Sequence, residues 1–430
     1  MADDAPPALL DRCIEGLLSR GHDHDVIQTL FVPGRIEILG KHTDYCGGRS
    51  ATCAIDRGFN IAFVASDESR LSMTSLELGE TCDFPLSPQL EPLIGTWANY
   101  PMSVARRLSA NFAGPLRGAE VVFASTLPQA SGMSSSSVFV VATFLVLDAA
   151  NGFLRRPEAQ TTITDPFELA DYLGTLENGQ SYRSLAGDRG VGTFGGSEDH
   201  TAITLGRAGR IGVYGYAPTR FEREVALPPD HMLLVASSGV LAEKTGAARG
   251  RYNQASLLAR ELVGLWNEDA DEPSLSLAAA LRSGDGALDH LQQIIRAAVA
   301  DGGHRGALLR RLDHFHSESE QILPAAMDAL AAGALPTFGR HVDESQRLAE
   351  QLLENQVPET NHLARTARRL GAVAASAFGA GFGGSAWALV PQAGAETFKA
   401  AWAEDYALVF PEAARRSHFF TTVPSQGTHR

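Results

Sequence analysis

Apolar positions in the first half of the chain follow two different spacings. Positions at helical spacing predict helices over residues 8–20, 93–110, 138–150 and 166–176. Shorter apolar or alternating runs predict strands over residues 32–39, 50–65, 119–124, 201–205, 211–214 and 232–237. This half of the chain is therefore predicted to combine helices with sheet.

After about residue 240 the apolar pattern becomes mostly helical. Helical spacing covers residues 261–266, 288–299, 307–323, 344–354, 361–377 and 393–406. Two further strands are predicted over residues 386–390 and 417–423. A charged stretch over residues 220–224, followed by two prolines, separates the two patterns. We therefore predict two domains, over residues 1–225 and 226–430.

One predicted strand runs into a loop that concentrates polar chemistry. Arg35 is followed by His42, Asp44 and Tyr45 and then by the glycine pair at 47–48. A carboxylate can accept hydrogen bonds from two hydroxyl groups, and an imidazole or a phenol can donate or accept a hydrogen bond. Glycines let a ligand approach the backbone closely. This combination indicates a binding site for a hydroxyl-rich ligand.

A second segment combines small polar residues with a long apolar run. Gly132 and the serines at 134–137 precede the apolar residues 138–147, which predicts a flexible loop entering a buried helix. Helix N-termini present unpaired N–H groups and the positive end of the helix dipole, so such a loop can bind the phosphates of ATP. An ordinary serine-capped core helix has the same local pattern.

A third segment, residues 378–385, is glycine-rich and runs into an apolar strand. Two Gly-x-Gly-x-x-Gly matches, at residues 190–195 and 379–384, lack the preceding strand and following helix of a dinucleotide site. The segment from Gly34 to Lys41 differs from a P-loop, because five residues separate its glycines and His42 stands where Ser or Thr would bind magnesium. We therefore exclude both nucleotide motifs.

Taken in order, the three segments resemble the motifs of the GHMP kinases, the family of galacto-, homoserine, mevalonate and phosphomevalonate kinases. The first resembles the galactokinase signature, which has Glu at the position of Lys41 and Asn at that of Cys46. The resemblance implies an α+β, two-domain GHMP kinase fold, with an N-terminal ribosomal-S5-domain-2-like domain and a C-terminal ferredoxin-like α/β domain. It also implies ATP-dependent phosphorylation of the anomeric (C1) hydroxyl of a galactose-like sugar, with ATP and Mg²⁺ as cofactors.

The resemblance also assigns catalytic and sugar-binding residues. Residues 195–200, Gly-Gly-Ser-Glu-Asp-His, resemble the galactokinase segment Cys-Gly-Ile-Met-Asp-Gln, which makes Asp199 the catalytic base. Arg35 would be its cationic neighbour, and an anomeric hydroxyl is acidic enough for a carboxylate beside a cation to deprotonate it. The expected sugar ligands are Lys41, His42, Asp44, Tyr45, Gly196 and Tyr252.

Nucleotide and metal ligands follow from the same resemblance. The residues expected to bind ATP are Trp97, Gly132, Ser134, Ser135, Ser136 and Ser137. Trp97 would lie near the adenine, although an aromatic core anchor has the same appearance in the sequence. Ser136 and Glu177 would bind Mg²⁺, which prefers hard oxygen ligands. The 22 positions from Glu177 to Asp199 exceed the family spacing, so a glycine-rich insertion over 181–191 is expected beside the site, and an exposed helix-end Glu is the alternative for Glu177.

Lys41 departs from the galactokinase signature in charge. Galactokinases have at this position a Glu that hydrogen-bonds the sugar near C6, so an acceptor has become a donor. If Lys41 points into the pocket, we expect a sugar with an anionic or acceptor-rich C6 group, such as galacturonate, or a higher-carbon galacto-sugar. If it points elsewhere or pairs with Glu37 or Glu198, galactose is the expected substrate.

Composition narrows the class of partners. The 430 residues are long enough for two cores, and their net charge of −14, without a basic cluster, argues against nucleic acid and anionic membrane surfaces. The acidic N-terminus lacks a signal-peptide pattern and no apolar run is long enough for a membrane span. We therefore expect a cytoplasmic monomer or small homo-oligomer whose four cysteines are reduced and whose partners are a small-molecule sugar and ATP.

Two other functions fit the same motifs. One is a GHMP kinase for another small metabolite, against which the intact His42, Asp44 and Tyr45 argue. The other is a non-catalytic sugar and ATP sensor that regulates a partner. The presence of Asp199, Arg35 and an uninterrupted serine loop favours catalysis over the sensor.

Overall fold

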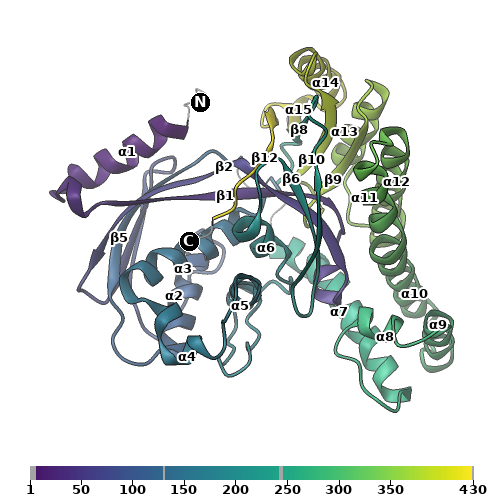
Figure 1. Cartoon of the computed structure of the whole chain (residues 1–430), viewed down its shortest axis with the longest axis horizontal. Helices are drawn as coiled ribbons and strands as arrows, with labels where there is room; N and C mark the ends of the chain where they lie inside the picture. The colour runs from purple at the N-terminus through teal and green to yellow at the C-terminus, as the bar shows by residue number, and fades with distance from the viewer. Residues whose placement is uncertain (1–5, 129–130, 242–245, 429–430) are drawn as a thin grey trace.

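The computed structural model describes residues 6–128, 131–241 and 246–428, and contains two β-sheets covered by helices (Figure 1). The larger sheet has the strand order β4-β3-β5-β2-β6-β7, and β1 and β12 also pair with β2. Its strands are β1 Gln28–Leu39, β2 Arg49–Ser66, β3 Arg70–Ser75, β4 Glu80–Pro85, β5 Gly118–Ser125, β6 Arg210–Gly215, β7 Arg220–Ala226 and β12 Pro424–Ser425. Within it β3 and β5 are parallel, and the other pairs are antiparallel.

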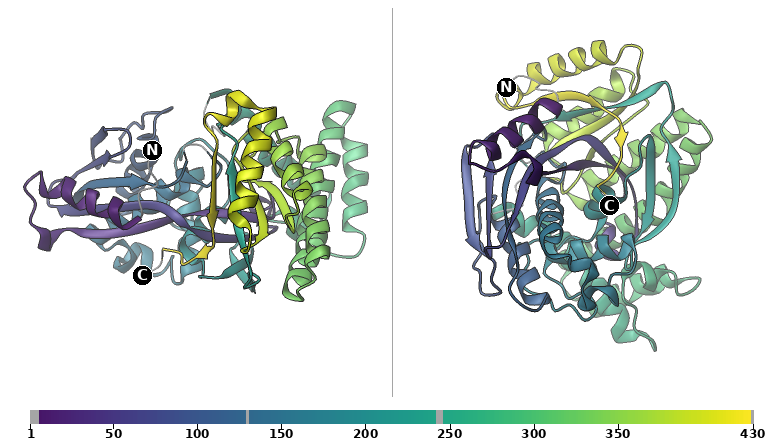
Figure 2. Two further views of the ribbon diagram at one scale, coloured as in Figure 1. Left: turned by 90° about the horizontal axis from the view of Figure 1, so that it is seen from above. Right: turned by 60° about the vertical axis from the view of Figure 1, so that its left-hand side comes forward.

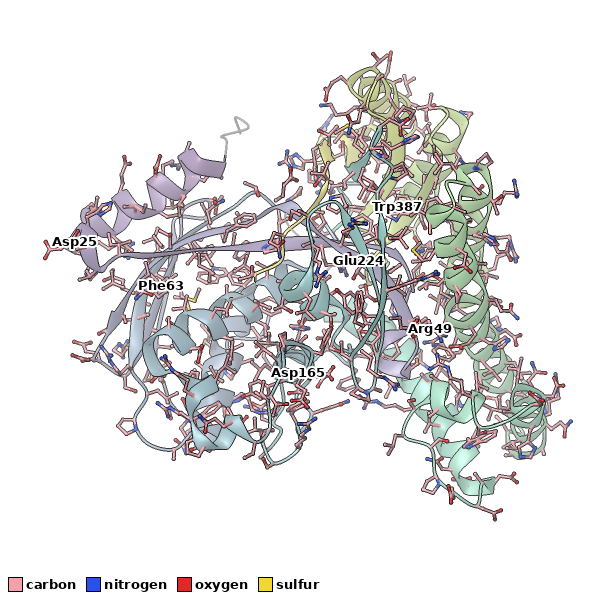
Figure 3. All side chains as sticks on the ribbon, viewed as in Figure 1. Asp25, Arg49, Phe63, Asp165, Glu224 and Trp387 are labelled. Atoms are coloured by element: carbon pink, nitrogen blue, oxygen red, sulfur yellow. The ribbon has the colours of Figure 1, made fainter. Side chains whose placement is uncertain are left out.

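Helices cover both faces of the larger sheet because side chains alternate along its strands. On β2, Phe59, Ile61 and Phe63 belong to a core that includes helix α3, whereas Ala62 packs with residues of α1 on the opposite face. Phe63 is labelled in Figure 3. The helices of this part of the chain are α1 Pro6–Leu18, α2 Asn99–Asn111, α3 Ser135–Asn151, α4 Pro157–Gln160, α5 Pro166–Asn178 and α6 Glu198–Leu205.

The smaller sheet is antiparallel and lies against a set of helices that come later in the chain. Its strand order is β11-β8-β10-β9, with bounds β8 His231–Ser237, β9 Ala374–Phe378, β10 Ser385–Pro391 and β11 His418–Thr422. Trp387 on β10 is fully buried (Figure 3). The later helices are α7 Gly246–Asp269, α8 Leu277–Leu281, α9 Ala287–Ala298, α10 Gly302–His316, α11 Leu323–Ala331, α12 Leu335–Leu348, α13 Pro358–Arg369, α14 Ala395–Val409 and α15 Pro411–Ala414.

The two sheets divide between β7 and β8, after residue 226. Figure 2 shows the end of the chain, in yellow, returning from the second sheet to the first, where β12 pairs with β2. We propose that the domains predicted over 1–225 and 226–430 meet at this division, with the last residues crossing back. No helix within residues 6–128, 131–241 and 246–428 is both long and apolar enough to cross a bilayer.

Two predicted elements are wrong in kind. Residues 201–205, predicted as a strand, form part of helix α6, and their threonine hydroxyls bond carbonyls four residues earlier. Their burial on almost every side removed the amphipathic period by which a helix is recognised. The helix predicted over 361–377 ends at Arg369, and Gly371, with φ +100°, turns the chain into β9. The alanines of β9 favoured the helical interpretation.

Candidate active site

A pocket of about 50 Å³ opens where the end of β1 and the loop after it meet α6 and the glycine loop before β10. Most of the residues predicted to bind or activate a sugar line it, namely Arg35, His42, Asp44, Tyr45, Gly196 and Asp199, and the predicted metal ligand Glu177 lines it as well. They come from positions up to 164 residues apart, so the fold brings together segments that the sequence separates.

Arg35 and Asp199 form the central ion pair of the pocket. Arg35 Nε donates to Asp199 Oδ1 at 2.7 Å, and another guanidinium nitrogen donates to the Gly132 carbonyl at 2.6 Å. Burial disfavours the charge of Arg35, but Asp199, Glu198 and Glu37 more than offset this effect and raise its pKa. The guanidinium therefore stays charged and ties the predicted base to the serine loop.

Asp44 connects the polar loop to the segment that carries the predicted base. Its Oδ2 accepts hydrogen bonds from the backbone N–H groups of Gly196 at 3.0 Å and Glu198 at 3.4 Å. Gly196 has no room for a side chain, because a Cβ there would lie 2.5 Å from Asp44 Oδ2. Burial raises the pKa of Asp44, although these backbone donors act in the opposite direction. Asp44 lines the pocket, so its carboxylate can accept hydrogen bonds from a ligand there.

Local backbone geometry holds His42 and Tyr45 in place. His42 has φ +57°, and its Nδ1 shares a 2.7 Å hydrogen bond with the Tyr45 hydroxyl, while Nε2 lies 3.1 Å from the Ala380 carbonyl. The glycine pair ends the turn: Gly47 has φ +75°, and a Cβ on Gly48 would lie 2.7 Å from the Phe315 ring. The glycines therefore let the later helices pack directly onto this loop.

A second, larger cavity of about 1120 Å³ adjoins the first, since Arg35 and Ala380 line both. The predicted phosphate-binding residues Gly132, Ser134, Ser135 and Ser136 line it, as does Trp97. Ser134, with φ +61°, precedes the first turn of α3 without capping it, and its hydroxyl has no hydrogen-bond partner among the described residues. The N–H groups at the N-terminus of α3 can therefore donate to phosphate oxygens.

Trp97 forms part of the wall of the larger cavity. Its ring stacks on Phe139 with centroids 5.6 Å apart, and its Nε1 donates to Glu80 at 2.9 Å. The predicted contact with adenine stays a prediction. Tyr252, the tyrosine predicted to close over the sugar, lies on α7, but its side chain is outside the described part of the structure.

Two carboxylates converge on a serine hydroxyl near the pocket. Ser137 Oγ lies 2.7 Å from Glu177 Oε2 and 3.1 Å from Asp199 Oδ2. One hydroxyl proton can serve one carboxylate at a time, so this all-oxygen group suits a divalent cation such as Mg²⁺. The predicted metal ligands were Ser136 and Glu177; the structure puts the hydroxyl of Ser137, not that of Ser136, against Glu177.

The long spacing before the predicted base is absorbed by a closed loop. The Val191 N–H donates to the Glu177 carbonyl at 2.8 Å, and the Asp188 N–H donates to the Gly179 carbonyl at 2.9 Å. Arg106 on α2 holds the loop from outside through a 2.8 Å bond to Asp188. The insertion predicted over 181–191 therefore forms a loop that begins and ends beside the C-terminal end of α5. Glu177 is buried beside the site, so the alternative of an exposed helix-end Glu is wrong.

Lys41 does not line the sugar pocket, so the structure contradicts its predicted role as a sugar ligand. The side chain is fully buried, and its Nζ donates to Ser345 Oγ at 3.1 Å. Ser345 Oγ in turn lies 2.9 Å from Glu318 Oε1, which also accepts from the Gly40 N–H at 2.8 Å. A buried ammonium requires anionic partners, and here these are Glu318 from the later helices and Glu37 from β1.

Some residues at the site were not found from the sequence. Glu37, Glu198 and His200 line the pocket, and the departure of positions 198 and 200 from the galactokinase segment was the available signal. Arg311 on α10 donates to the His42 carbonyl and to Cys46 Sγ. The sequence pattern gave this helix no role at the site, whereas Arg311 is buried and holds the polar loop.

All four cysteines are buried free thiols. Burial raises the pKa of Cys46 to about 12, although Arg311 acts in the opposite direction. The thiolate of Cys46, which is the reactive form, is therefore disfavoured near neutral pH. We expect no thiol of the native protein to react with a disulfide reagent within minutes, and four to react after denaturation. Rapid labelling of Cys46 with loss of activity would contradict this.

Profiles of three protein families match the chain. The profile described as "Galactokinase galactose-binding signature" matches residues 21–64, "GHMP kinases N terminal domain" matches residues 99–188, and "GHMP kinases C terminal" matches residues 326–408. Similar curated proteins include the galactokinase of Chloroflexus aggregans, 28% identical over 87% of each chain. Another is the galactokinase of Actinobacillus pleuropneumoniae serotype 5b, 26% identical over 90% of this chain and 91% of that protein.

Solved structures share the fold of this chain. Lactococcus lactis galactokinase in complex with galactose superimposes with a TM-score of 0.77 at 24% identity, covering 96% of this chain and 97% of that one. The mevalonate kinase of L. major in complex with R-mevalonate gives a TM-score of 0.56 at 14% identity, covering 93% and 97%. The two-domain α+β fold expected from the three motifs is confirmed.

Proposed function

Because this chain is a GHMP kinase of the galactokinase type, we propose that it transfers the γ-phosphoryl group of ATP to the anomeric hydroxyl of a galactose-configured sugar. The ion pair of Arg35 and Asp199, 2.7 Å apart at the junction of the two cavities, is the observation that carries this proposal. Phosphoryl transfer needs a base or orienting group for the hydroxyl and positive charge beside the phosphate, and this pair supplies both.

In the proposed reaction the sugar lies in the smaller pocket and the triphosphate in the larger one. Asp44 accepts ring hydroxyls, and the Gly196 backbone and the His42 and Tyr45 pair complete the polar wall. Asp199 accepts the proton of the C1 hydroxyl as O1 bonds to the γ-phosphorus and the bond from that phosphorus to the β-phosphate oxygen breaks. ADP leaves with the bonding electrons, and Arg35 stabilises the charge that develops between the two sites.

The oxygen ligands beside Ser137 fit Mg²⁺. Glu177, Asp199 and the Ser136 and Ser137 hydroxyls would hold the ion, and when bound it would neutralise phosphate charge. Asp199 would then have two roles, because Oδ1 accepts from Arg35 and Oδ2 faces Ser137. The Asp199 carboxylate is therefore held through both of its oxygens.

The charges of the pocket favour galactose over galacturonate. Carboxylates dominate its lining, which includes Glu37, Asp44, Glu177, Glu198 and Asp199. Lys41, the cation expected to favour an anionic C6 group, lies outside the pocket. A sugar carboxylate would therefore meet like charges, and sugars acidic at C6 become the second candidate, behind galactose and its neutral derivatives.

The test is ADP release from ATP and Mg²⁺ with galactose, galacturonate, arabinose, glucose, N-acetylgalactosamine and higher-carbon galacto-sugars. We expect turnover of galactose, with kcat/KM for glucose at least about 100-fold lower because its C4 hydroxyl has the wrong configuration. Asp199→Ala is the control for contaminating kinases. ATP binding without turnover of any sugar would favour the sensor, and turnover of galacturonate above galactose would overturn the proposal that the pocket disfavours sugars acidic at C6.

The remaining expectations stay predictions. Partners beyond sugar and ATP, the cytoplasmic location and the monomeric or small homo-oligomeric state each need a direct measurement. The alternative of a GHMP kinase for another small metabolite is tested by the same assay with non-sugar alcohols. Such a substrate would not supply the ring hydroxyls from which Asp44 is proposed to accept hydrogen bonds.

A further inference from the structure

Two carboxylates in the sugar pocket have no part in the proposed reaction. Glu37 and Glu198 both line the pocket and are 3% and 4% exposed. In each of them Oε1 accepts no hydrogen bond from the residues described by the structure. A buried carboxylate oxygen without a donor is unfavourable, so each of these Oε1 atoms calls for a partner from elsewhere.

Neighbouring cations do not fill this role for Glu198. Arg35 Nε lies 4.0 Å from Glu198 Oε1, beyond hydrogen-bonding distance, and the guanidinium already donates to Asp199 and to the Gly132 carbonyl. Lys41, which acts electrostatically on Glu37, donates to Ser345. Burial raises the pKa of Glu198, and the charges of Glu37 and Asp44 raise it further. Arg35 acts in the opposite direction, but it gives Glu198 Oε1 no hydrogen bond.

The Mg²⁺ ligands proposed above do not include these groups. Those ligands are Glu177, Asp199 and the hydroxyls of Ser136 and Ser137, whereas Glu37 and Glu198 line the sugar pocket. His200 also lines the pocket, with Nε2 3.2 Å from Glu177 Oε2 and with no hydrogen bond to Nδ1 within the described chain. What the pocket lacks is a donor that arrives with the substrate.

Building on the proposed function, we propose that the preferred substrate is a galacto-configured amino sugar whose ammonium group pairs with Glu198. An ammonium group brings three donors and a positive charge, whereas a hydroxyl brings one donor and no charge. An acetylated amine has lost the charge and two of the three donors, so it would not replace the free amine.

The position of Glu198 indicates which carbon carries the amine. Glu198 directly precedes Asp199, the base for the C1 hydroxyl, and its N–H contacts Asp44, the ligand for the ring hydroxyls farther along the sugar. With the C1 hydroxyl at Asp199 and the other ring hydroxyls at Asp44, we infer that a carboxylate joined to both segments meets the substituent next to the anomeric carbon. The inferred substrate is therefore a 2-amino sugar. The galactokinase segment has an apolar Met at this position, so this acidic contact is a departure of the present chain.

The experiment compares kcat/KM for galactosamine, galactose and N-acetylgalactosamine. We expect the wild type to prefer galactosamine over galactose, with a higher KM for galactose. Glu198→Gln and Glu198→Met should each lower the galactosamine-to-galactose ratio by at least about tenfold, which is the size of one charge-assisted hydrogen bond. Glu224→Gln, at a carboxylate on β7 in an exposed ion pair (Figure 3), should leave the ratio unchanged.

The outcomes separate this inference from the proposed function. Turnover of galactose with a wild-type ratio below one would overturn the amino-sugar inference and leave the sugar 1-kinase intact. An unchanged ratio in a folded Glu198→Gln, verified by its melting curve, would overturn it as well. Absence of turnover with either sugar would instead count against the proposed function itself.

Discussion

Asp199→Asn is expected to lower kcat for galactose by roughly 10³-fold while KM changes by only a few fold, because a positioned general base contributes about 10²–10⁴ in rate. The amide cannot accept the C1 proton, but it keeps the shape that Arg35 contacts at 2.7 Å. Steady-state ADP release with saturating ATP measures both parameters. The matched control is Asp83→Asn, an aspartate in an exposed ion pair with Arg70 on β3 and β4, which should not change kcat.

The pH profile distinguishes a true base from a residue that only orients the hydroxyl. If Asp199 takes the proton, protonation of Asp199 should lower kcat of the wild type at acid pH. This decrease should be absent in Asp199→Asn. Arg35 and Ser137 both contact the Asp199 carboxylate, so part of the loss could reflect displacement of either group. A variant that keeps kcat within tenfold of wild type would remove Asp199 from the role of base.

The loops that build the site could be predicted from sequence because their chemistry is local. Arg35, Asp44 and Asp199 each lie in a short motif, and all three line one pocket. Lys41 shows where this approach fails. Its partners Ser345 and Glu318 are about 300 positions away, and nothing in the local segment indicates them. The direction of a side chain depends on tertiary partners, which a motif does not contain.

The secondary-structure prediction failed where burial on nearly all sides left no polar positions to mark the helical period. Helix α6 is buried on nearly all sides, so residues 201–205 had no polar face to mark the helical period. The hairpin of β3 and β4 was missed, although the burial of β4 alternates along the strand. The insertion at 181–191 was located by spacing, but the hydrogen bonds that return the chain to Glu177 follow from backbone geometry that spacing does not reveal.

The buried position of Lys41 predicts a large loss of stability on reversing its charge. Glu318 is fully buried, its Oε2 has no hydrogen-bond partner in the described structure, and Glu37 is also close enough to sense Lys41. Lys41→Glu would place a third carboxylate in this group. Removing one partner of a buried pair costs about 3–5 kcal/mol, and the added like charge should raise the loss further. Thermal unfolding followed by circular dichroism should therefore show a melting temperature lowered by several degrees or more.

Two comparisons make this prediction specific to the Lys41 site. Lys399→Glu carries the same charge change, but Lys399 pairs with Glu396 within one exposed helix turn, so its loss should stay below about 1 kcal/mol. Lys41→Met combined with Glu318→Gln should recover much of the stability lost in Lys41→Glu, because neither charge is then left unpaired. The loop after β1 is anchored to Glu318 through Gly40, so destabilised variants should also bind sugar more weakly. If Lys41→Glu instead melted like the wild type and turned over galactose faster, Lys41 would face the sugar, and the buried arrangement would be wrong.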